Sequence, residues 1–402
     1  MGLVGQVGWW VAPPRQPTGP AYPSDPTHQT RKMLHRFAKV VVGCTVLLVL
    51  AGSLVTSTDS GLSVPDWPTS YGWSMFTFPP SRWVGGILYE HGHRLIASTV
   101  GFLTIVLADW LWVQDPRRWM KRLGFTALGA VIAQGVLGGL TVLFFLPAPV
   151  STAHAGLAEI FFCITVAIAL FTSPRWIAGY SGEGDGSPYL TSRPVPAGVD
   201  DAILRRMATT ATVLIYIQIL LGATMRHTGA GLAIPDFPLM FGHLVPPHWD
   251  GKIAIHFAHR AGALVVTLAI LATSAHVWYQ HAGRYELTRP ASIIVAFVAV
   301  QVALGAFTVL SRRDVWINSS HVVCGALVLT TSLVLTLRSW RVKFAGAPVA
   351  VRLKPDTTTV DAAATAHALR SVRLPPSHNA SADRRSLGGS GQADLPATGA
   401  RP

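Results

Sequence analysis

The chain of 402 residues is half hydrophobic, carries charged side chains at only 13% of its positions and has a mean hydropathy of +0.40. Because a soluble domain is about one quarter charged, this balance excludes an ordinary soluble protein and indicates a membrane protein. The formal net charge of +13 does not indicate nucleic-acid binding, since many Lys and Arg lie between apolar segments, where they set membrane topology.

The first 35 residues are rich in Pro, Gly and Thr and lack the short apolar core of a signal peptide. We therefore predict a disordered N-terminal leader at 1–35. Met33 stands shortly before the first apolar segment and is a candidate for the start of the protein.

Eight apolar segments follow, each close to the roughly 20 residues that a helix needs to cross a bilayer. They lie at about 37–57, 85–113, 123–145, 153–172, 207–226, 252–278, 291–310 and 318–338. The predicted fold class is an all-α membrane protein with eight transmembrane helices.

A linker rich in Gly, Ser and Pro at 173–206 separates the first four segments from the last four. We predict an N-terminal four-helix half at 36–172 and a C-terminal four-helix half at 207–340. The tail at 341–402 is rich in Ala, Ser, Pro, Arg and Gly, and its lack of periodicity predicts disorder.

The loops between the segments alternate in their content of basic residues. The basic set holds Arg31, Lys32, Arg36, Arg117, Arg118, Lys121, Arg122, Arg175, Arg193, Arg205, Arg206, Arg284, Arg289, Arg338, Arg341 and Lys343. The other set holds only Arg82, Arg226, Lys252, Arg312 and Arg313. The positive-inside rule places the basic loops and both termini in the cytoplasm of a multi-pass protein, which we expect in the plasma membrane.

The two halves repeat one another in sequence. LVTSTDSGLSVPDWP at 54–68 resembles TMRHTGAGLAIPDFP at 224–238, EHGHR at 90–94 resembles HFAHR at 256–260, and QGVLGGLTV at 134–142 resembles QVALGAFTV at 301–309. We therefore predict two tandem pseudo-symmetric four-helix bundles of the same orientation. Parallel repeats also occur in transporters, so the repeat alone does not decide the function.

The three cysteines lie inside apolar segments, and none forms a CxxC pair. They are Cys44, Cys163 and Cys324. This pattern argues against a disulfide framework and a zinc–cysteine site, and it favours buried free thiols.

Four histidines occupy equivalent positions on the even-numbered predicted helices: His93, His154, His259 and His321. All fall in the outer portions of their helices, so each half can bring two imidazoles to one level on facing helices. This is the arrangement of a bis-histidine heme site. A single such histidine could be a hydrogen-bonded core residue, but four equivalent ones favour heme, and a zinc site would need more ligands at one point. We expect Ser151-Thr152 and Ser319-Ser320 to cap the fourth and eighth helices.

One carboxylate distinguishes the two halves. Glu90 lies three residues before His93 and shares its helix face, whereas the equivalent position in the second half is His256. The asymmetry predicts that the two sites do different work, although an interfacial carboxylate at a helix start is the plain alternative.

Two arginines follow the histidines of the second and sixth predicted helices. Arg94 and Arg260 point about 100° away from their neighbours, so each could pair with a heme propionate or with a loop carboxylate. Asp66 and Asp236, in the repeated PDWP and PDFP turns, are the candidate carboxylates.

Taken as an ordered set, these motifs make residues 36–340 resemble the heme A synthase family, including its mitochondrial members. The resemblance rests on EHGHR, STAHAG, HFAHR, NSSHVVCG and the duplicated GLxxPDxP turns. Some bacterial members carry a cysteine pair in an outer loop of the first half. This chain has no cysteine in 58–84 or 146–152, so a mechanism that needs the pair would be excluded.

The resemblance implies that the protein oxidises the C8 methyl group of heme O to a formyl group, which gives heme A for terminal oxidases. His259 and His321, with Arg260 beside them, would bind a resident heme b. His93 and His154, with Arg94, would bind the substrate heme and its iron, with Glu90 as the catalytic group. The implied partners are heme O from a heme O synthase, an electron donor that the sequence does not identify, and the lipid bilayer; a homo-oligomer stays open.

Two other functions fit the same residues. A diheme electron-transfer cytochrome would hold heme b in both halves and change neither. A heme transporter built on parallel repeats would bind heme without a bis-histidine spectrum.

Overall fold

The computed structural model describes residues 26–181 and 200–341, and in these residues the regular secondary structure is helical, with no strand. The helices are α1 Pro26–Ser57, α2 Gly86–Gln114, α3 Arg118–Leu143, α4 Ala148–Phe171, α5 Pro174–Ser181, α6 Ala202–His227, α7 Gly251–Gln280, α8 Tyr285–Leu310 and α9 Val315–Ser339, with a short 3₁₀ turn η1 at Pro80–Arg82. Eight of them, all except α5, are long and apolar enough to span a membrane. The predicted all-α fold with eight membrane helices is confirmed.

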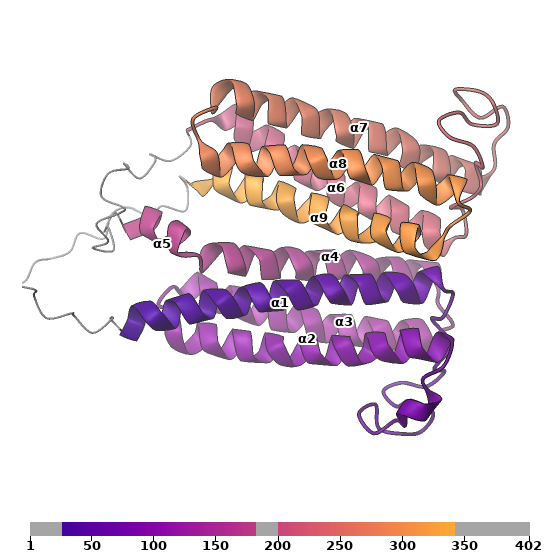
Figure 1. Cartoon of the computed structure of the whole chain (residues 1–402), viewed down its shortest axis with the longest axis horizontal. Helices are drawn as coiled ribbons and strands as arrows, with labels where there is room; N and C mark the ends of the chain where they lie inside the picture. Colours follow the sequence, from indigo (N-terminus) through magenta and orange to yellow (C-terminus); the bar gives the residue numbers. More distant parts are fainter. Residues whose placement is uncertain (1–25, 182–199, 342–402) are drawn as a thin grey trace, which may run out of the picture. The chain divides into compact units, whose positions relative to one another are not determined.

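The long helices form two groups of four (Figure 1). In the first half, α1 packs on α2, α2 on α3, α3 on α4 and α4 on α1, and α6 to α9 close in the same way in the second half. The halves meet where α1 packs on α9 and where α4 packs on α6 and α9. Apolar side chains such as Leu107, Phe161 and Ile168 fill the first half, and Ile270 and Leu329 belong to the core of the second.

The helices extend beyond several predicted boundaries. α1 begins at Pro26, so 26–35 belong to a helix and not to a disordered leader. No Pro or Gly interrupts the chain between Pro26 and Gly43, which lets the helix run on past the apolar segment. The predicted linker contains α5, and α6 begins at Ala202. The remaining leader, the central part of the linker and the predicted tail lie outside the described residues.

The predicted serine and threonine caps are wrong. Ser151 lies inside α4 and Ser319 inside α9. The cap of α9 is Asp314, whose Oδ1 accepts hydrogen bonds from the backbone N–H groups of Trp316 and Ile317 at 3.0 Å each. A carboxylate also meets the positive end of the helix dipole, which explains why α9 begins at the acid.

A polar cluster joins the two halves near the ends of α1 and α6. The Nη2 atom of Arg226 donates to the carbonyl of Ser53 at 2.9 Å and to Oγ of Ser57 at 2.8 Å. Ser57 Oγ also accepts from Nδ2 of Asn318 at 3.1 Å and lies 2.9 Å from Oγ of Ser319. Since interhelical hydrogen bonds hold membrane helices together, this cluster ties α1 to α6 and α9.

We expect Arg226→Met to lower the free energy of unfolding by about 1–3 kcal/mol, because the buried Ser57 loses its charged partner while the apolar volume is kept. Thermal unfolding of the purified protein in detergent measures the change. Arg82→Met, in the exposed turn η1, is the matched control and should leave the unfolding midpoint unchanged. Equal midpoints for the two variants would contradict the role of the cluster.

Candidate functional site

The four predicted histidines lie within about two turns of the N-terminal ends of their helices. His93 is on α2, His154 on α4, His259 on α7 and His321 on α9. His93 and His154 lie within electrostatic reach of one another, and so do His259 and His321. Each half therefore brings its two imidazoles together.

Each imidazole lies against a glycine of the preceding membrane helix. A Cβ atom on Gly52 would stand 3.1 Å from Cε1 of His93, and one on Gly138 would stand 3.2 Å from Cε1 of His154. In the second half the corresponding distances are 2.8 Å from Gly222 to His259 and 3.0 Å from Gly305 to His321. A larger residue at any of these glycines would have to push the imidazole ring away. We call these contacts the four glycine cradles.

Three of the four rings keep a buried nitrogen without a partner. Within 26–181 and 200–341, Nδ1 of His93, His154 and His321 has no hydrogen bond of good geometry. His259 differs, because Nε2 of Gln218 lies 3.0 Å from its Nδ1 and donates to its carbonyl at 2.7 Å. Buried polar atoms are rarely left unpaired unless a ligand or water completes them. Paired imidazoles that lie on glycines, three of them with an unpaired buried nitrogen, are a donor set that fits a heme.

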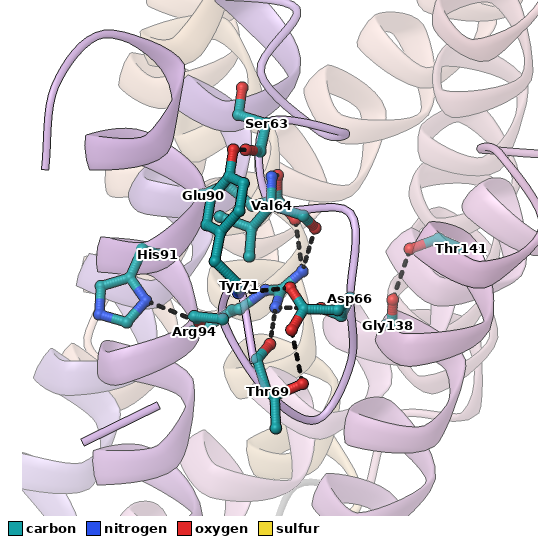
Figure 2. Close-up of polar contacts among 11 residues, drawn as sticks. Ser63, Val64, Asp66, Thr69, Tyr71, Glu90, His91, Arg94, Gly138 and Thr141 are labelled. Atoms are coloured by element: carbon teal, nitrogen blue, oxygen red, sulfur yellow. Dashed lines mark hydrogen bonds and ion pairs between the residues drawn. The ribbon is translucent and has the colours of Figure 1, made fainter. Parts of the chain in front are cut away.

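Glu90 is held by both of its oxygens beside the first-half site. Its Oε1 forms an ion pair with Nη2 of Arg94 at 2.6 Å, and its Oε2 accepts from the backbone N–H of Val64 at 2.8 Å (Figure 2). Both side chains are buried. The carboxylate is thus fixed between α2 and the loop that precedes it.

Arg94 binds the loop through its backbone. Its guanidinium donates to the carbonyls of Asp66 at 2.7 Å, Thr69 at 3.0 Å and Val64 at 2.9 Å (Figure 2). The predicted pairing of Arg94 with the Asp66 carboxylate is therefore wrong, because the turn presents its carbonyl groups to the arginine.

The second half repeats these contacts between an arginine and the turn, with a histidine in place of the glutamate. We call the arginine–turn contacts of each half the arginine clamp. Arg260 donates to the carbonyls of Ile234 at 3.1 Å and Asp236 at 2.8 Å, and not to the Asp236 carboxylate. His256 occupies the position of Glu90, with its Nδ1 3.2 Å from the backbone N–H of Ile234 and its Nε2 3.2 Å from Nε of Arg260. A neutral imidazole accepts at only one nitrogen, so His256 cannot satisfy both donors as a carboxylate can. The predicted difference between the halves therefore has a structural counterpart.

The aspartates of the two turns cap their own loops. Asp66 accepts from the backbone N–H groups of Tyr71 at 2.7 Å and Gly72 at 2.8 Å and from the hydroxyl of Thr69 at 2.5 Å. Asp236 accepts from Phe241 and Gly242 in the same way. Burial alone would raise the pKa of Asp66, but these hydrogen bonds outweigh it and hold the pKa below its ordinary value of 3.8.

One buried residue of the site was missed in the sequence. His91 is fully buried between Phe78 and Trp83, and its Nδ1 lies 3.1 Å from Oγ of Ser70. The signal was the first histidine of EHGHR, which the second half replaces with Phe257. His91 fastens the first-half loop onto α2 by a contact that the second half lacks.

We expect Asp66→Asn to loosen the first-half turn, because an amide offers one acceptor oxygen where the carboxylate offers two. At pH 7 the loss should be about 1 kcal/mol, which is a roughly fivefold faster hydrogen exchange in the peptide that contains Tyr71 and Gly72. A depressed folded pKa means that the stabilisation exists above pH 3.8 and is lost as the pH falls through the folded pKa. The difference between wild type and variant should therefore disappear in strong acid.

Asp59→Asn is the control, since the exposed Asp59 carboxylate meets Arg313 only at 3.7 Å. Exchange that is as fast in this control as in Asp66→Asn, or that is unchanged in Asp66→Asn, would contradict the capping role.

Comparison with known proteins finds similarity to one family. A family model for cytochrome oxidase assembly proteins, COX15-CtaA, matches residues 35–333, a range that contains all four histidines. A heme A synthase of Symbiobacterium thermophilum is 32% identical over 285 residues, which cover 69% of this chain and 85% of the relative. One of Halalkalibacterium halodurans is 28% identical over 309 residues, covering 74% and 95%. One of Agrobacterium fabrum is 27% identical over 376 residues, covering 81% and 94%.

Proposed function

The chain belongs to the heme A synthase family, COX15-CtaA, and on that basis we propose that it oxidises the C8 methyl group of heme O to a formyl group. The protein is then a membrane oxidoreductase whose product is heme A. The observation that carries the proposal is the pair of half-buried imidazoles on glycine cradles in each half, in a chain of this family.

We infer that the halves divide the work. His259 and His321 would hold a resident heme b, whose iron supplies one-electron chemistry, and His93 and His154 would hold heme O as substrate. The contacts of Gln218 with Nδ1 and with the carbonyl group of His259 support this division, because they fix a ligand ring of the resident site more firmly than any ring of the substrate site. The equivalent position in the first half is Leu48, which cannot make such a bond.

Glu90 is the group that we assign to catalysis. Conversion of a methyl group to a formyl group breaks two C–H bonds and forms a C=O bond to an added oxygen atom, so protons must move at the reacting centre. A carboxylate that is fixed by Arg94 and the Val64 N–H can accept or release a proton at one defined place. The second half has His256 there, which supports a catalytic role in the first half alone.

Arg94 and Arg260 would act by holding the turns that cover the two sites. Each guanidinium binds carbonyl groups of one turn, which fixes that turn over the helix that carries the histidine. Direct contact of either arginine with a heme propionate stays a prediction.

We also propose an orientation in the plasma membrane. Arg117 lies between α2 and α3, and Arg118 and Lys121 lie in the first turn of α3, at the end of the first half opposite to His93 and His154. The positive-inside rule then puts both termini in the cytoplasm and the heme sites toward the outer side. The electron donor is still to be identified, and a homo-oligomer stays an expectation.

The function is tested by expression of the chain in cells that make heme O, followed by extraction of the hemes. Wild type should yield heme A. Glu90→Gln should lower the heme A yield by about 100-fold or more while the b-type spectrum is kept, because the amide cannot take up a proton as the carboxylate does, although its carbonyl oxygen can still accept from Arg94 or the Val64 N–H. His259→Ala should lose the b-type spectrum instead.

Tyr89→Phe is the control for Glu90→Gln, since its side chain points about 100° away around α2, and it should make heme A at the wild-type level. Folded, heme-loaded wild-type protein that yields no heme A would overturn the enzyme assignment. Heme b in both halves without a modified product would favour the diheme cytochrome.

The glycine cradle of the substrate half gives a second test. Gly138→Ala should push the His154 ring and reduce heme A formation at least tenfold, because a Cβ at 3.2 Å from Cε1 is too close to be tolerated without a shift. Gly135→Ala, one turn earlier on α3, meets no atom within 4 Å and is the matched control. Equal activity of the two variants would show that the cradle does not position His154.

A further inference from the structure

A second group of potential metal ligands lies at the opposite end of the second half. Asp201 is the N-cap of α6, His276 lies in the last two turns of α7, and His281 is the C-cap of α7. Seventeen residues of α7 separate His276 from His259, which is about 25 Å along the helix. The group is therefore separate from the heme sites.

The three side chains converge on one oxygen atom. Nε2 of His276 lies 2.8 Å and Nε2 of His281 lies 2.9 Å from Oδ2 of Asp201. The other oxygen, Oδ1, is used separately, since it accepts from the backbone N–H of Leu204 at 2.8 Å. One atom from each of the three residues can be chosen so that all lie within 4.8 Å of one another.

The fold does not require this group. The equivalent positions in the first half, with the offsets of the repeat, are Arg31, Trp110 and Asp115. There Asp115 forms an ion pair with Arg117 at 2.7 Å, and no imidazole takes part in it. That ion pair is local to the connection between α2 and α3 and does not join α1 to α2, so the first half forms without a three-residue contact at these positions.

The surroundings leave the carboxylate available to a cation. The Asp201 side chain is 16% exposed, and those of His276 and His281 are 19% and 14% exposed, so water can reach the group. The nearest basic side chains in sequence have acidic neighbours of their own, since Arg205 lies 3.7 Å from Asp200 and Arg284 lies 2.9 Å from Glu286.

We propose that Asp201, His276 and His281 bind a Zn²⁺ ion that fastens the start of α6 to the end of α7. Two imidazoles and one carboxylate are a common zinc ligand set, with water as the fourth ligand. Adjacent ligands in a tetrahedral zinc site lie about 3.3 Å apart, so separations of 2.8 and 2.9 Å need to widen by only about half an ångström. Far from the hemes, the ion would stabilise the junction with the linker.

The test uses the full-length, heme-loaded protein in detergent, because bound heme keeps His93, His154, His259 and His321 away from added metal. After treatment with a chelator, the protein is dialysed against buffers of fixed free zinc, and bound zinc is measured by mass spectrometry. We expect one tight zinc ion per chain. Asp201→Asn keeps the helix cap, and it should weaken zinc binding at least tenfold, as should His276→Gln and His281→Gln.

One control is the immediate sequence neighbour of a ligand, and the other is an imidazole in the loop at the far end of α6 and α7. Asp200→Asn changes the adjacent carboxylate, which is 95% exposed, and His243→Gln removes an exposed loop imidazole; both should bind zinc like wild type. Zinc should raise the unfolding midpoint of wild type but not that of Asp201→Asn. Absence of tight zinc in wild type, or equal binding by Asp201→Asn and Asp200→Asn, would overturn the proposal without bearing on heme A formation.

Discussion

The contact between an imidazole ring and the backbone of a neighbouring helix determines how the sites are built. At Gly52, Gly138, Gly222 and Gly305 the absence of a side chain lets a histidine ring lie directly on the helix. Each contact joins consecutive membrane helices, namely α1 with α2, α3 with α4, α6 with α7 and α8 with α9. A helical hairpin therefore carries one imidazole, and two hairpins that pack together make one site. Interior packing leaves little freedom in such contacts, so a single methyl group is enough to disturb them.

The same fold can support two different chemical environments because the arginine that holds each turn and the residue that differs between the halves are separate positions. Arg94 and Arg260 hold equivalent turns by equivalent carbonyl groups, so the geometry of the loop is kept in both halves. The residue one turn earlier on each helix is free to differ, and it is Glu90 in one half and His256 in the other. A charge is thus added to one site without any change in the fold that supports it.

The features that depend on composition and on the internal repeat could be predicted from the sequence. The features that depend on individual contacts between atoms could not. Hydropathy was sufficient for the eight spans, and the repeat singled out the four histidines. The motif spacing placed Asp66 near Arg94, but it could not show that the turn offers its carbonyls while the carboxylate caps the loop. The glycine cradles were hidden because a glycine in an apolar helix is common. The Asp201 group joins residues 75 and 80 positions apart and is absent from the first half, so no repeat pointed to it.

Each of the four histidines comes from one pair of consecutive membrane helices, which matters for the order in which the protein is assembled. Chains enter the membrane from the N-terminus, and domains fold in that order. His93 is in place once α1 and α2 have inserted, and His154 follows with α3 and α4, so both histidines of the proposed first site are present before α6 is inserted. The contacts that Arg226 makes with Ser53 and Ser57 can form only later, when α6 arrives. The nascent protein therefore passes through a stage with one complete pair of proposed ligands and with an uncovered face on α1 and α4, which the second half then closes.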